Sequence, residues 1–194
     1  IGGDYFIDKP ESCGPATPAY EVKIVDPSST ETLPKGETGE LWVRGGHVIK
    51  GYLNRPEATE ETIVDGWLRT GDMAKMDEDD FIYIVDRIKD MVLRGGENIY
   101  CAEVESAIFD HPAVSECTVF GVPDDRLGEE VGAAVFVGNK KLDATELREH
   151  CRNLIASFKV PKYVWFMDEP LPRNASGKFL KRELREKLSI NDSV

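Results

Sequence analysis

The sequence has no long hydrophobic run, and no apolar stretch approaches the ~20 residues that a membrane-spanning helix needs. It also lacks an initial methionine and the pattern of a signal peptide. These absences predict a cytoplasmic protein without a transmembrane segment. They also lead us to expect that Ile1 is an internal residue of a longer chain.

Positive charge is scarce as well. The chain carries 24 Lys and Arg against 36 Asp and Glu, which gives a formal net charge of -12. Proteins that bind nucleic acid by neutralising phosphates are basic, so this balance argues against a nucleic-acid partner. It leaves open an anionic small ligand that is held by a local group of basic side chains.

Cysteine and histidine are few, and their spacing fits neither a disulfide framework nor a metal motif. They are Cys13, Cys101, Cys117 and Cys151, with His47, His111 and His150. We expect the cysteines to be reduced and buried, as in cytosolic proteins, and the histidines to be structural. No metal site is predicted within this chain.

The patterns that are present predict an α+β protein in two parts. Residues 1–86 combine short strands with close turns, which predicts a small β-rich unit. Strands are expected at 20–25, 40–44 and 81–85, a helix at 56–63 and a loop over 1–19. Residues 87–194 alternate helical and strand patterns, which predicts an α+β unit.

The second part has recognisable helix signals. Asp143-Ala144-Thr145-Glu146 has the form of a capping box, followed by a helix whose buried face would carry Leu147, Cys151, Leu154 and Ile155. Further helices are expected at 102–109 and 179–187, and strands at 115–122, 130–137 and 163–167. The last residues, 191–194, are expected to fray.

The stretch 67–104 organises the rest of the chain. A charged loop ends at Asp72, an apolar run follows at 81–85, and a charge cluster at 86–90 precedes Gly95-Gly96. Asp72 and Arg87 could hold a polyol or a phosphate, and the glycines would let the backbone approach a ligand closely. The alternative is a solvated connector, which is the favoured interpretation of an arbitrary charge cluster.

A second motif occupies residues 172–178, Pro-Arg-Asn-Ala-Ser-Gly-Lys. The glycine before Lys178 would let its ammonium reach out of the fold, and a compact cation suits a phosphate or carboxylate oxygen. The stretch is not a P-loop, because the first glycine of that motif is missing. Taken alone, it is a weak signal, because most lysines near a glycine are ordinary surface residues.

Together these motifs resemble the acyl-adenylate-forming (AMP-binding) superfamily, and most closely the C-terminal portion of a fatty or medium-chain acyl-CoA synthetase. The matching residues are Gly39-Glu40-Leu41, Gly51-Tyr52-Leu53, Gly66-Trp67, Thr70-Gly71-Asp72, Asp86-Arg87-Ile88-Lys89-Asp90, Gly95-Gly96-Glu97-Asn98-Ile99 and Gly177-Lys178. The resemblance implies that residues 1–86 end the large N-terminal domain and that 87–194 form a small, mobile α+β lid domain.

The resemblance also implies roles for single residues. Lys178 would be the catalytic lysine that bridges the substrate carboxylate and the α-phosphate of ATP, where it would offset negative charge. Asp72 and Arg87 would contact the ribose hydroxyls, and Ile84 would line the nucleotide site.

Three further residues are assigned by the same resemblance. Lys89 would be the hinge between the two parts. Gly95 and Gly96 would form the loop at the CoA thioester site, where Gly96 leaves room for pantetheine.

The implied reaction joins a carboxylic acid to CoA, with ATP converted to AMP and pyrophosphate through an acyl-adenylate. ATP, CoA and Mg²⁺ would be required, with the Mg²⁺ site in the missing N-terminal domain of the same chain. We therefore expect the 194-residue chain alone to be inactive. The alternatives are an adenylation domain that loads a carrier protein, a non-catalytic interaction module that kept the fold, and a purely structural β-rich domain.

Overall fold

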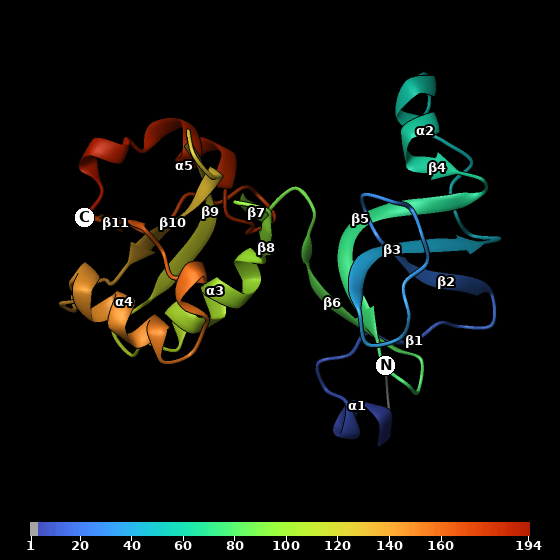
Figure 1. Ribbon diagram of the computed structural model, residues 1–194, viewed down its shortest axis with the longest axis horizontal. Coiled ribbons are helices and arrows are strands. Elements are labelled where there is room, and N and C mark those ends of the chain that lie inside the picture. Colours follow the sequence, from blue (N-terminus) through green and yellow to red (C-terminus); the bar gives the residue numbers. More distant parts are fainter. Residues whose placement is uncertain (1–3) are drawn as a thin grey trace. The chain divides into compact units, whose positions relative to one another are not determined.

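The computed structural model describes residues 4–194, which form two units, one ending at Lys89 and the other starting at Asp90 (Figure 1). The first unit extends beyond residue 86, where the sequence placed its end. The reason lies in strand β6 (Phe81–Arg87): Arg87 pairs with Asp72, and the Ile88 N–H donates to the carbonyl of Gly71 at 2.9 Å. The chain through residue 88 is therefore held to the first unit.

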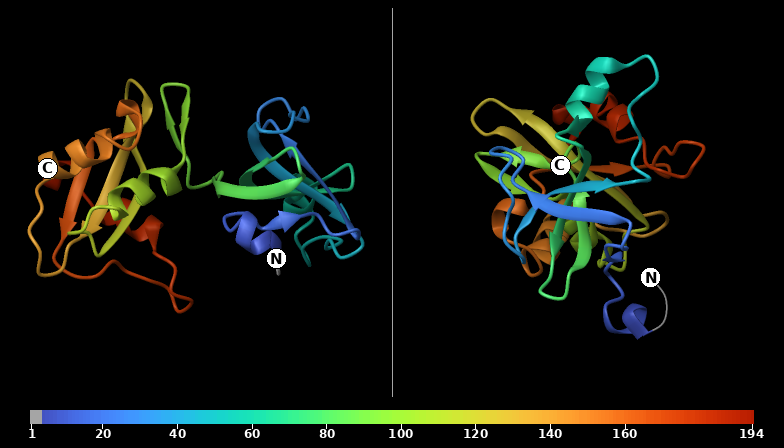
Figure 2. Two further views of the ribbon diagram at one scale, coloured as in Figure 1. Left: turned by 90° about the horizontal axis from the view of Figure 1, so that it is seen from below. Right: turned by 90° about the vertical axis from the view of Figure 1, so that its right-hand side faces the viewer.

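The first unit is an antiparallel sheet in the strand order β1-β6-β5-β3-β2, with β4 paired to β5 (Figure 2). Its other strands are β1 (Gly14–Pro15), β2 (Tyr20–Val25), β3 (Thr38–Gly45), β4 (Ile63–Val64) and β5 (Trp67–Met76). Its helices are α1 (Asp4–Asp8) and α2 (Pro56–Thr62). The core of this unit is formed by Ile24, Leu41, Ala74 and Ile82.

The local signals of the first unit are mostly confirmed. Strand β2 has the bounds that its alternating pattern predicted, and α2 begins with Pro56 in its first turn, where a missing N–H costs nothing. The prediction of a loop over 1–19 is wrong for the described residues, because they contain α1 and β1. There the Ser12 hydroxyl and the Cys13 N–H both donate to the Ile82 carbonyl, which ties this segment to β6.

The second unit is a five-stranded sheet in the order β11-β10-β7-β8, with β9 paired to β10. Its strands are β7 (Val92–Arg94), β8 (Glu97–Ile99), β9 (Glu116–Asp124), β10 (Gly128–Phe136) and β11 (Tyr163–Met167). Its helices are α3 (Cys101–Phe109), α4 (Ala144–Arg152) and α5 (Lys181–Lys187), with 3-10 turns at Ser157–Lys159 and Ile190–Asp192. Strands β10 and β11 are parallel, and the other pairs are antiparallel.

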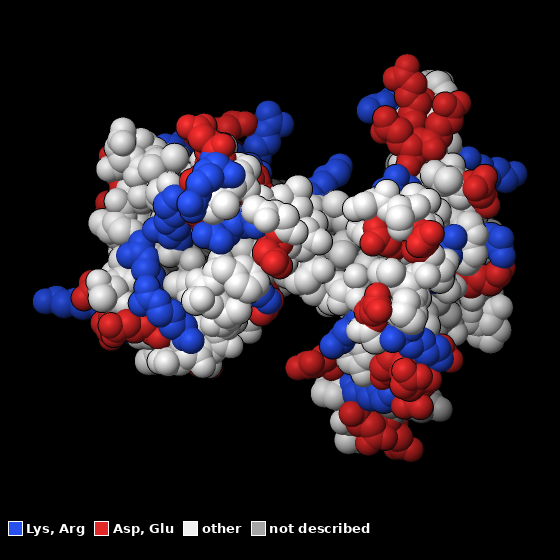
Figure 3. All heavy atoms as spheres, in the orientation of Figure 1, with Lys and Arg blue, Asp and Glu red and all other residues white. Residues whose placement is uncertain are grey.

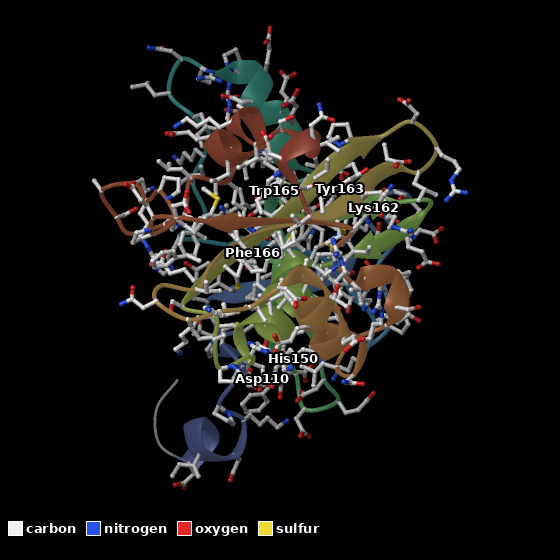
Figure 4. All side chains as sticks on the ribbon, turned by 90° about the vertical axis from the view of Figure 1, so that its left-hand side faces the viewer. Asp110, His150, Lys162, Tyr163, Trp165 and Phe166 are labelled. Carbon is white, nitrogen blue, oxygen red and sulfur yellow. The ribbon has the colours of Figure 1, made fainter. Side chains whose placement is uncertain are left out.

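Both faces of this sheet are covered. Successive side chains of a strand point to opposite faces, so Ala133 and Val135 of β10 pack in one core with α3 and α4, whereas Ala134 packs in the other with α5. On β11, Trp165 and Phe166 lie on opposite sides of the strand (Figure 4). Burial on both faces makes this unit a layered α+β domain.

Helix α4 begins where the sequence predicted but ends earlier than predicted. Asp143 is its N-cap, as predicted, and accepts the N–H groups of Thr145 at 2.8 Å and Glu146 at 2.9 Å. The helix ends at Arg152, so the prediction that Leu154 belongs to its buried face is wrong, and that side chain is half exposed.

The end of the chain is held rather than frayed. The Val194 N–H donates to the Val164 carbonyl at 3.0 Å, and the Arg148 guanidinium donates to the Val194 carbonyl at 2.5 Å. The expectation of fraying at 191–194 is therefore wrong, because helix α4 and strand β11 both bind this segment.

Three of the four cysteines are buried as expected, but Cys13 is exposed, and none forms a disulfide. Burial raises the pKa of Cys117 to about 12 and that of Cys151 to about 11. These two thiols therefore stay protonated at neutral pH and are poor nucleophiles and metal ligands.

The charges are unevenly distributed over the surface. Acidic side chains cluster over α2, which exposes Glu57, Glu60 and Glu61, whereas Lys and Arg form a band on the visible face of the second unit (Figure 3). Among the helices of residues 4–194, none combines the length and the hydropathy needed to cross a lipid bilayer.

The contrast between Leu147 and Leu154 gives a prediction for stability. Leu147 is fully buried between α4 and the sheet, so Leu147→Ala should lower the free energy of unfolding by about 2–5 kcal/mol through lost burial and the cavity left behind. Leu154→Ala, the matched control at a half-exposed site, should cost less than about 1 kcal/mol. Urea denaturation of both variants measures this, and equal costs would contradict the described packing.

Candidate functional site

Asp72 and Arg87 face each other across neighbouring strands. They are directly paired in the β5–β6 register, and the Arg87 Nε donates to Asp72 Oδ1 at 2.9 Å. The side chains are 60% exposed for Arg87 and 30% exposed for Asp72. Exposed ion pairs contribute at most about 1 kcal/mol, so a ligand could rearrange this pair at little cost. Both the carboxylate acceptors and the remaining guanidinium donors are accessible.

Asp72 is presented by a bulge in β5. Between Arg69 and Met73 this strand has three residues, Thr70 to Asp72, opposite the single residue Leu41 of β3. The Thr70 hydroxyl donates to the Leu41 carbonyl at 2.7 Å and accepts the Asp72 N–H at 3.1 Å. Such bulges redirect side chains at the edges of sites. The Thr70-Gly71-Asp72 motif therefore forms the bulge that orients the Asp72 side chain.

Glycine is required inside this bulge. Gly71 has φ +74, a left-handed conformation that residues with a Cβ seldom adopt. Its carbonyl accepts the Ile88 N–H, and its own N–H donates to Glu40 Oε1 at 3.3 Å. Glu40, which lies on β3, was matched to the family pattern but given no role from the sequence. Glu40 is only 2% exposed, and this burial, which indicates a role in the site, is not apparent from the sequence.

Ile84 and Lys89 lie elsewhere in the first unit. Ile84 is on β6, opposite Ala74, and its side chain is 48% exposed. Lys89 is exposed in the turn that follows β6 and is the last residue of this unit.

Gly95 and Gly96 form the turn of a hairpin between β7 and β8, which the sequence did not reveal. Their φ values are +60 and +90, so the turn needs residues without a Cβ. The Gly95 N–H donates to the Leu127 carbonyl at 2.8 Å. A Cβ added to Gly96 would meet nothing within 4 Å. Within this unit, therefore, the backbone conformation and not local packing favours glycine at position 96.

A buried ion pair supports this hairpin. Arg94 donates to both carboxylate oxygens of Glu130, at 2.6 and 3.1 Å, and Glu130 is only 4% exposed. The hydrogen bonds to Glu130 raise the pKa of the Arg94 guanidinium further. The Leu93 N–H also donates to Glu129 at 3.0 Å. Strand β10 thus fixes the base of the glycine turn through two carboxylates.

Lys178 lies in an exposed loop that is organised by one asparagine. The Asn174 side-chain oxygen accepts the N–H of Ser176 at 3.0 Å and the N–H of Lys178 at 2.9 Å. Gly177, with φ +83, makes the turn, and Arg173 and Phe179 close it as an isolated bridge. Among the residues described, the Lys178 ammonium makes no hydrogen bond or ion pair. Its charge is therefore available to an anionic ligand.

The predicted site residues divide between the two units. Asp72, Arg87, Ile84 and Lys89 belong to the first unit, and Gly95, Gly96 and Lys178 to the second. In the described part of the chain, His, Cys, Asp and Glu form no group of three that could hold a metal ion.

Within the first unit, Asp72 and Arg87 present a carboxylate beside a guanidinium, and in the second unit Lys178 presents an ammonium that is unpaired among the described residues. Family comparison identifies the class of protein. The model described as AMP-binding enzyme matches residues 3–53, and the model described as AMP-binding enzyme C-terminal domain matches residues 103–178. The chain belongs to the AMP-binding enzymes, and the α+β fold that was expected is confirmed.

Individual relatives are similar along nearly the whole chain. A feruloyl-CoA synthase of Amycolatopsis sp is 47% identical over 185 residues, which is 94% of this chain and 37% of that protein. A long-chain-fatty-acid–CoA ligase of Yersinia pestis is 46% identical over 175 residues, 90% of this chain and 31% of that protein.

A solved structure has the same fold. The o-succinylbenzoate CoA synthetase of Bacillus subtilis, in complex with its acyl-adenylate intermediate, matches with a TM-score of 0.85 and 37% identity. The match covers 95% of this chain and 37% of that one. The present chain thus spans about a third of the length of these relatives.

The lysine loop yields a second prediction. Asn174→Ala removes the acceptor of the Lys178 N–H, so amide hydrogen exchange at Lys178 should accelerate about fivefold, since one hydrogen bond contributes about 1 kcal/mol. Asn153→Ala, at the exposed end of α4, is the matched control and should leave Lys178 unchanged. Unchanged exchange in Asn174→Ala would show that the loop is held by other contacts.

Proposed function

We propose that this chain is the C-terminal part of an ATP-dependent, AMP-forming acyl-CoA synthetase. The whole enzyme would convert a carboxylic acid and ATP into an acyl-adenylate and pyrophosphate, after which CoA would displace AMP to give acyl-CoA. The observation that carries the proposal is the 47% identity to a CoA synthase along 94% of the chain. The relatives act on different acids by name, so the proposal specifies a carboxylic acid and no particular one.

The first unit would bind the nucleoside. The Asp72 carboxylate would accept hydrogen bonds from the ribose hydroxyls, and Arg87 would donate to the same sugar. Their separation of 2.9 Å supports this assignment because the two side chains lie close enough to bind one sugar. Ile84 would add an apolar contact from the exposed side of β6.

Lys178 would act in the adenylation step. Attack of the substrate carboxylate on the α-phosphate builds negative charge on the phosphate oxygens, and a positioned cation offsets that charge. The Lys178 ammonium has no partner among the described residues, so no ion pair must be broken before it reaches the phosphate. This property supports lysine as the catalytic residue of the second unit.

The glycine hairpin would serve the second step. With no Cβ at Gly96, the main chain can lie against the pantetheine arm of CoA while the thiol attacks the adenylate. Lys178 and Gly96 belong to separate loops of one unit and would be needed in successive steps. We therefore infer that the second unit changes its pose about Lys89, as a hinge of few residues allows.

The remaining two thirds of the enzyme would supply the acid pocket and the phosphate loop, so the chain alone is expected to be inactive. Mg²⁺ accompanies ATP in a solved structure of o-succinylbenzoate CoA synthetase. The described residues offer no group of three ligands for it, so we assign the ion to the ATP phosphates and to residues outside this chain. Cysteines without a disulfide support a cytoplasmic location.

The rival functions either transfer the acyl group to an acceptor other than CoA or involve no catalysis. An adenylation domain would load a carrier protein, but the relatives reported above are named for CoA, which supports CoA as the acceptor. An interaction module or a purely structural domain would have no need to keep both Asp72 and Lys178. Release of AMP on addition of CoA alone, without a carrier protein, separates these alternatives.

Lys178→Ala in the complete enzyme should lower the rate of adenylate formation about 100- to 1000-fold, the usual cost of one preorganised donor. Thioester formation from a supplied acyl-adenylate should persist. Lys141→Ala, at an exposed lysine in the segment before α4 of the same unit, is the control and should change neither half-reaction. Equal losses in both half-reactions would refute the role assigned to Lys178.

Lys89→Pro tests the hinge. Proline fixes φ near -65° and restricts the preceding residue, so thioester formation should fall steeply while adenylate formation remains. No hydrogen bond from the Lys89 N–H occurs in the described structure, so the substitution removes none. Lys89→Ala is the control for loss of the side chain. Near wild-type thioester formation by Lys89→Pro would place the pivot elsewhere.

A further inference from the structure

Glu40 is a buried charge within the first sheet. It is 2% exposed and lies on β3, next to Leu41 of the apolar core. Burying a carboxylate is costly unless donors compensate for the lost water. Here Oε2 accepts from Trp42 Nε1 at 2.9 Å and from Arg69 Nε at 3.1 Å. The Arg69 Nη2 atom forms an ion pair with the same oxygen at 3.0 Å.

The other carboxylate oxygen holds the main chain of the bulge. Glu40 Oε1 accepts the Gly71 N–H at 3.3 Å, and the Gly71 carbonyl accepts the Ile88 N–H at 2.9 Å. The peptide groups on either side of Gly71 are thus fixed from opposite directions. Because Asp72 follows directly, its position depends on these two bonds. A bulge leaves strand N–H groups without ladder partners, and Glu40 supplies the missing acceptor.

A carboxylate is the group that fits this place. All four contacts to Glu40 are donors, and two of them come from a guanidinium. A glutamine would have to point its NH₂ group at Trp42 and Arg69 or at the Gly71 N–H, so a donor would meet a donor. A simple stabilising role would be served as well by an apolar residue, since replacing a buried ion pair with well-packed apolar groups is often neutral or stabilising.

We propose that Glu40 is the positioning residue of the nucleotide site: it holds the Thr70–Asp72 bulge so that the Asp72 carboxylate meets the ribose hydroxyls. Glu40 does not touch the ligand and acts through Gly71. This inference rests on the proposed function, in which Asp72 binds the ribose of ATP.

The test compares two nucleotides in the complete enzyme. Carboxylate-dependent pyrophosphate exchange is measured with ATP and with 2′,3′-dideoxy-ATP, for the wild type and for Glu40→Gln. With ATP, kcat/KM should fall about tenfold or more in Glu40→Gln. With dideoxy-ATP, which gives Asp72 nothing to bind, the variant should be within about twofold of the wild type. Equal losses with both nucleotides would overturn the proposal and leave Glu40 merely structural.

Two controls complete the experiment. Glu21→Gln changes an exposed glutamate of the neighbouring strand β2 and should behave as the wild type with both nucleotides. In an Asp72→Ala background, Glu40→Gln should add little further loss with ATP, because the residue through which it acts is already gone. Additive losses in the double variant would contradict the proposal.

A milder variant covers the case in which Glu40→Gln does not fold. Trp42→Phe keeps an aromatic ring at this buried position and removes the indole N–H that donates to Glu40, together with part of the ring system. Its kcat/KM should fall several-fold with ATP and stay unchanged with dideoxy-ATP, and any other pattern would count against Glu40. A wild type without carboxylate-dependent exchange would refute the proposed function itself, which is a different outcome from loss of nucleotide selectivity.

Discussion

The bulge of Thr70, Gly71 and Asp72 is the constraint on which the first unit depends. It places Asp72 opposite Arg87, and its Gly71 carbonyl holds the N–H of Ile88. The end of the first sheet is therefore set by the same three residues that present the carboxylate. The backbone segment that presents Asp72 to a ligand therefore also binds the start of the connection to the second unit.

In the second unit, charged side chains hold the glycine turn between β7 and β8. Its glycine turn has no side chains of its own, so the neighbouring strand must hold it. Arg94 and Glu130 do so through a bidentate pair that is largely screened from water, and Glu129 adds a bond to the Leu93 N–H. Buried, hydrogen-bonded carboxylates thus support the candidate ligand loops of both units.

The sequence predicted those elements whose pattern is local. Strands β2 and β11 have the expected bounds because apolar alternation or a continuous apolar run marks each of them. The β7–β8 hairpin was missed because three-residue strands are too short to show a period. Glu40 sits at a strand position that would suit an exposed residue, and its burial is decided by Arg69 and Gly71, which lie about thirty residues further along the chain.

The four cysteines, all within the described residues, differ in access: Cys13 is exposed, and the other three are buried. The natural chain thus carries its own attachment point for a maleimide dye, placed in the first unit. A fluorophore there, paired with an acceptor introduced into the second unit, would turn the distance between the two into an optical signal. Among the described residues, no other cysteine is exposed to compete with Cys13 for the dye.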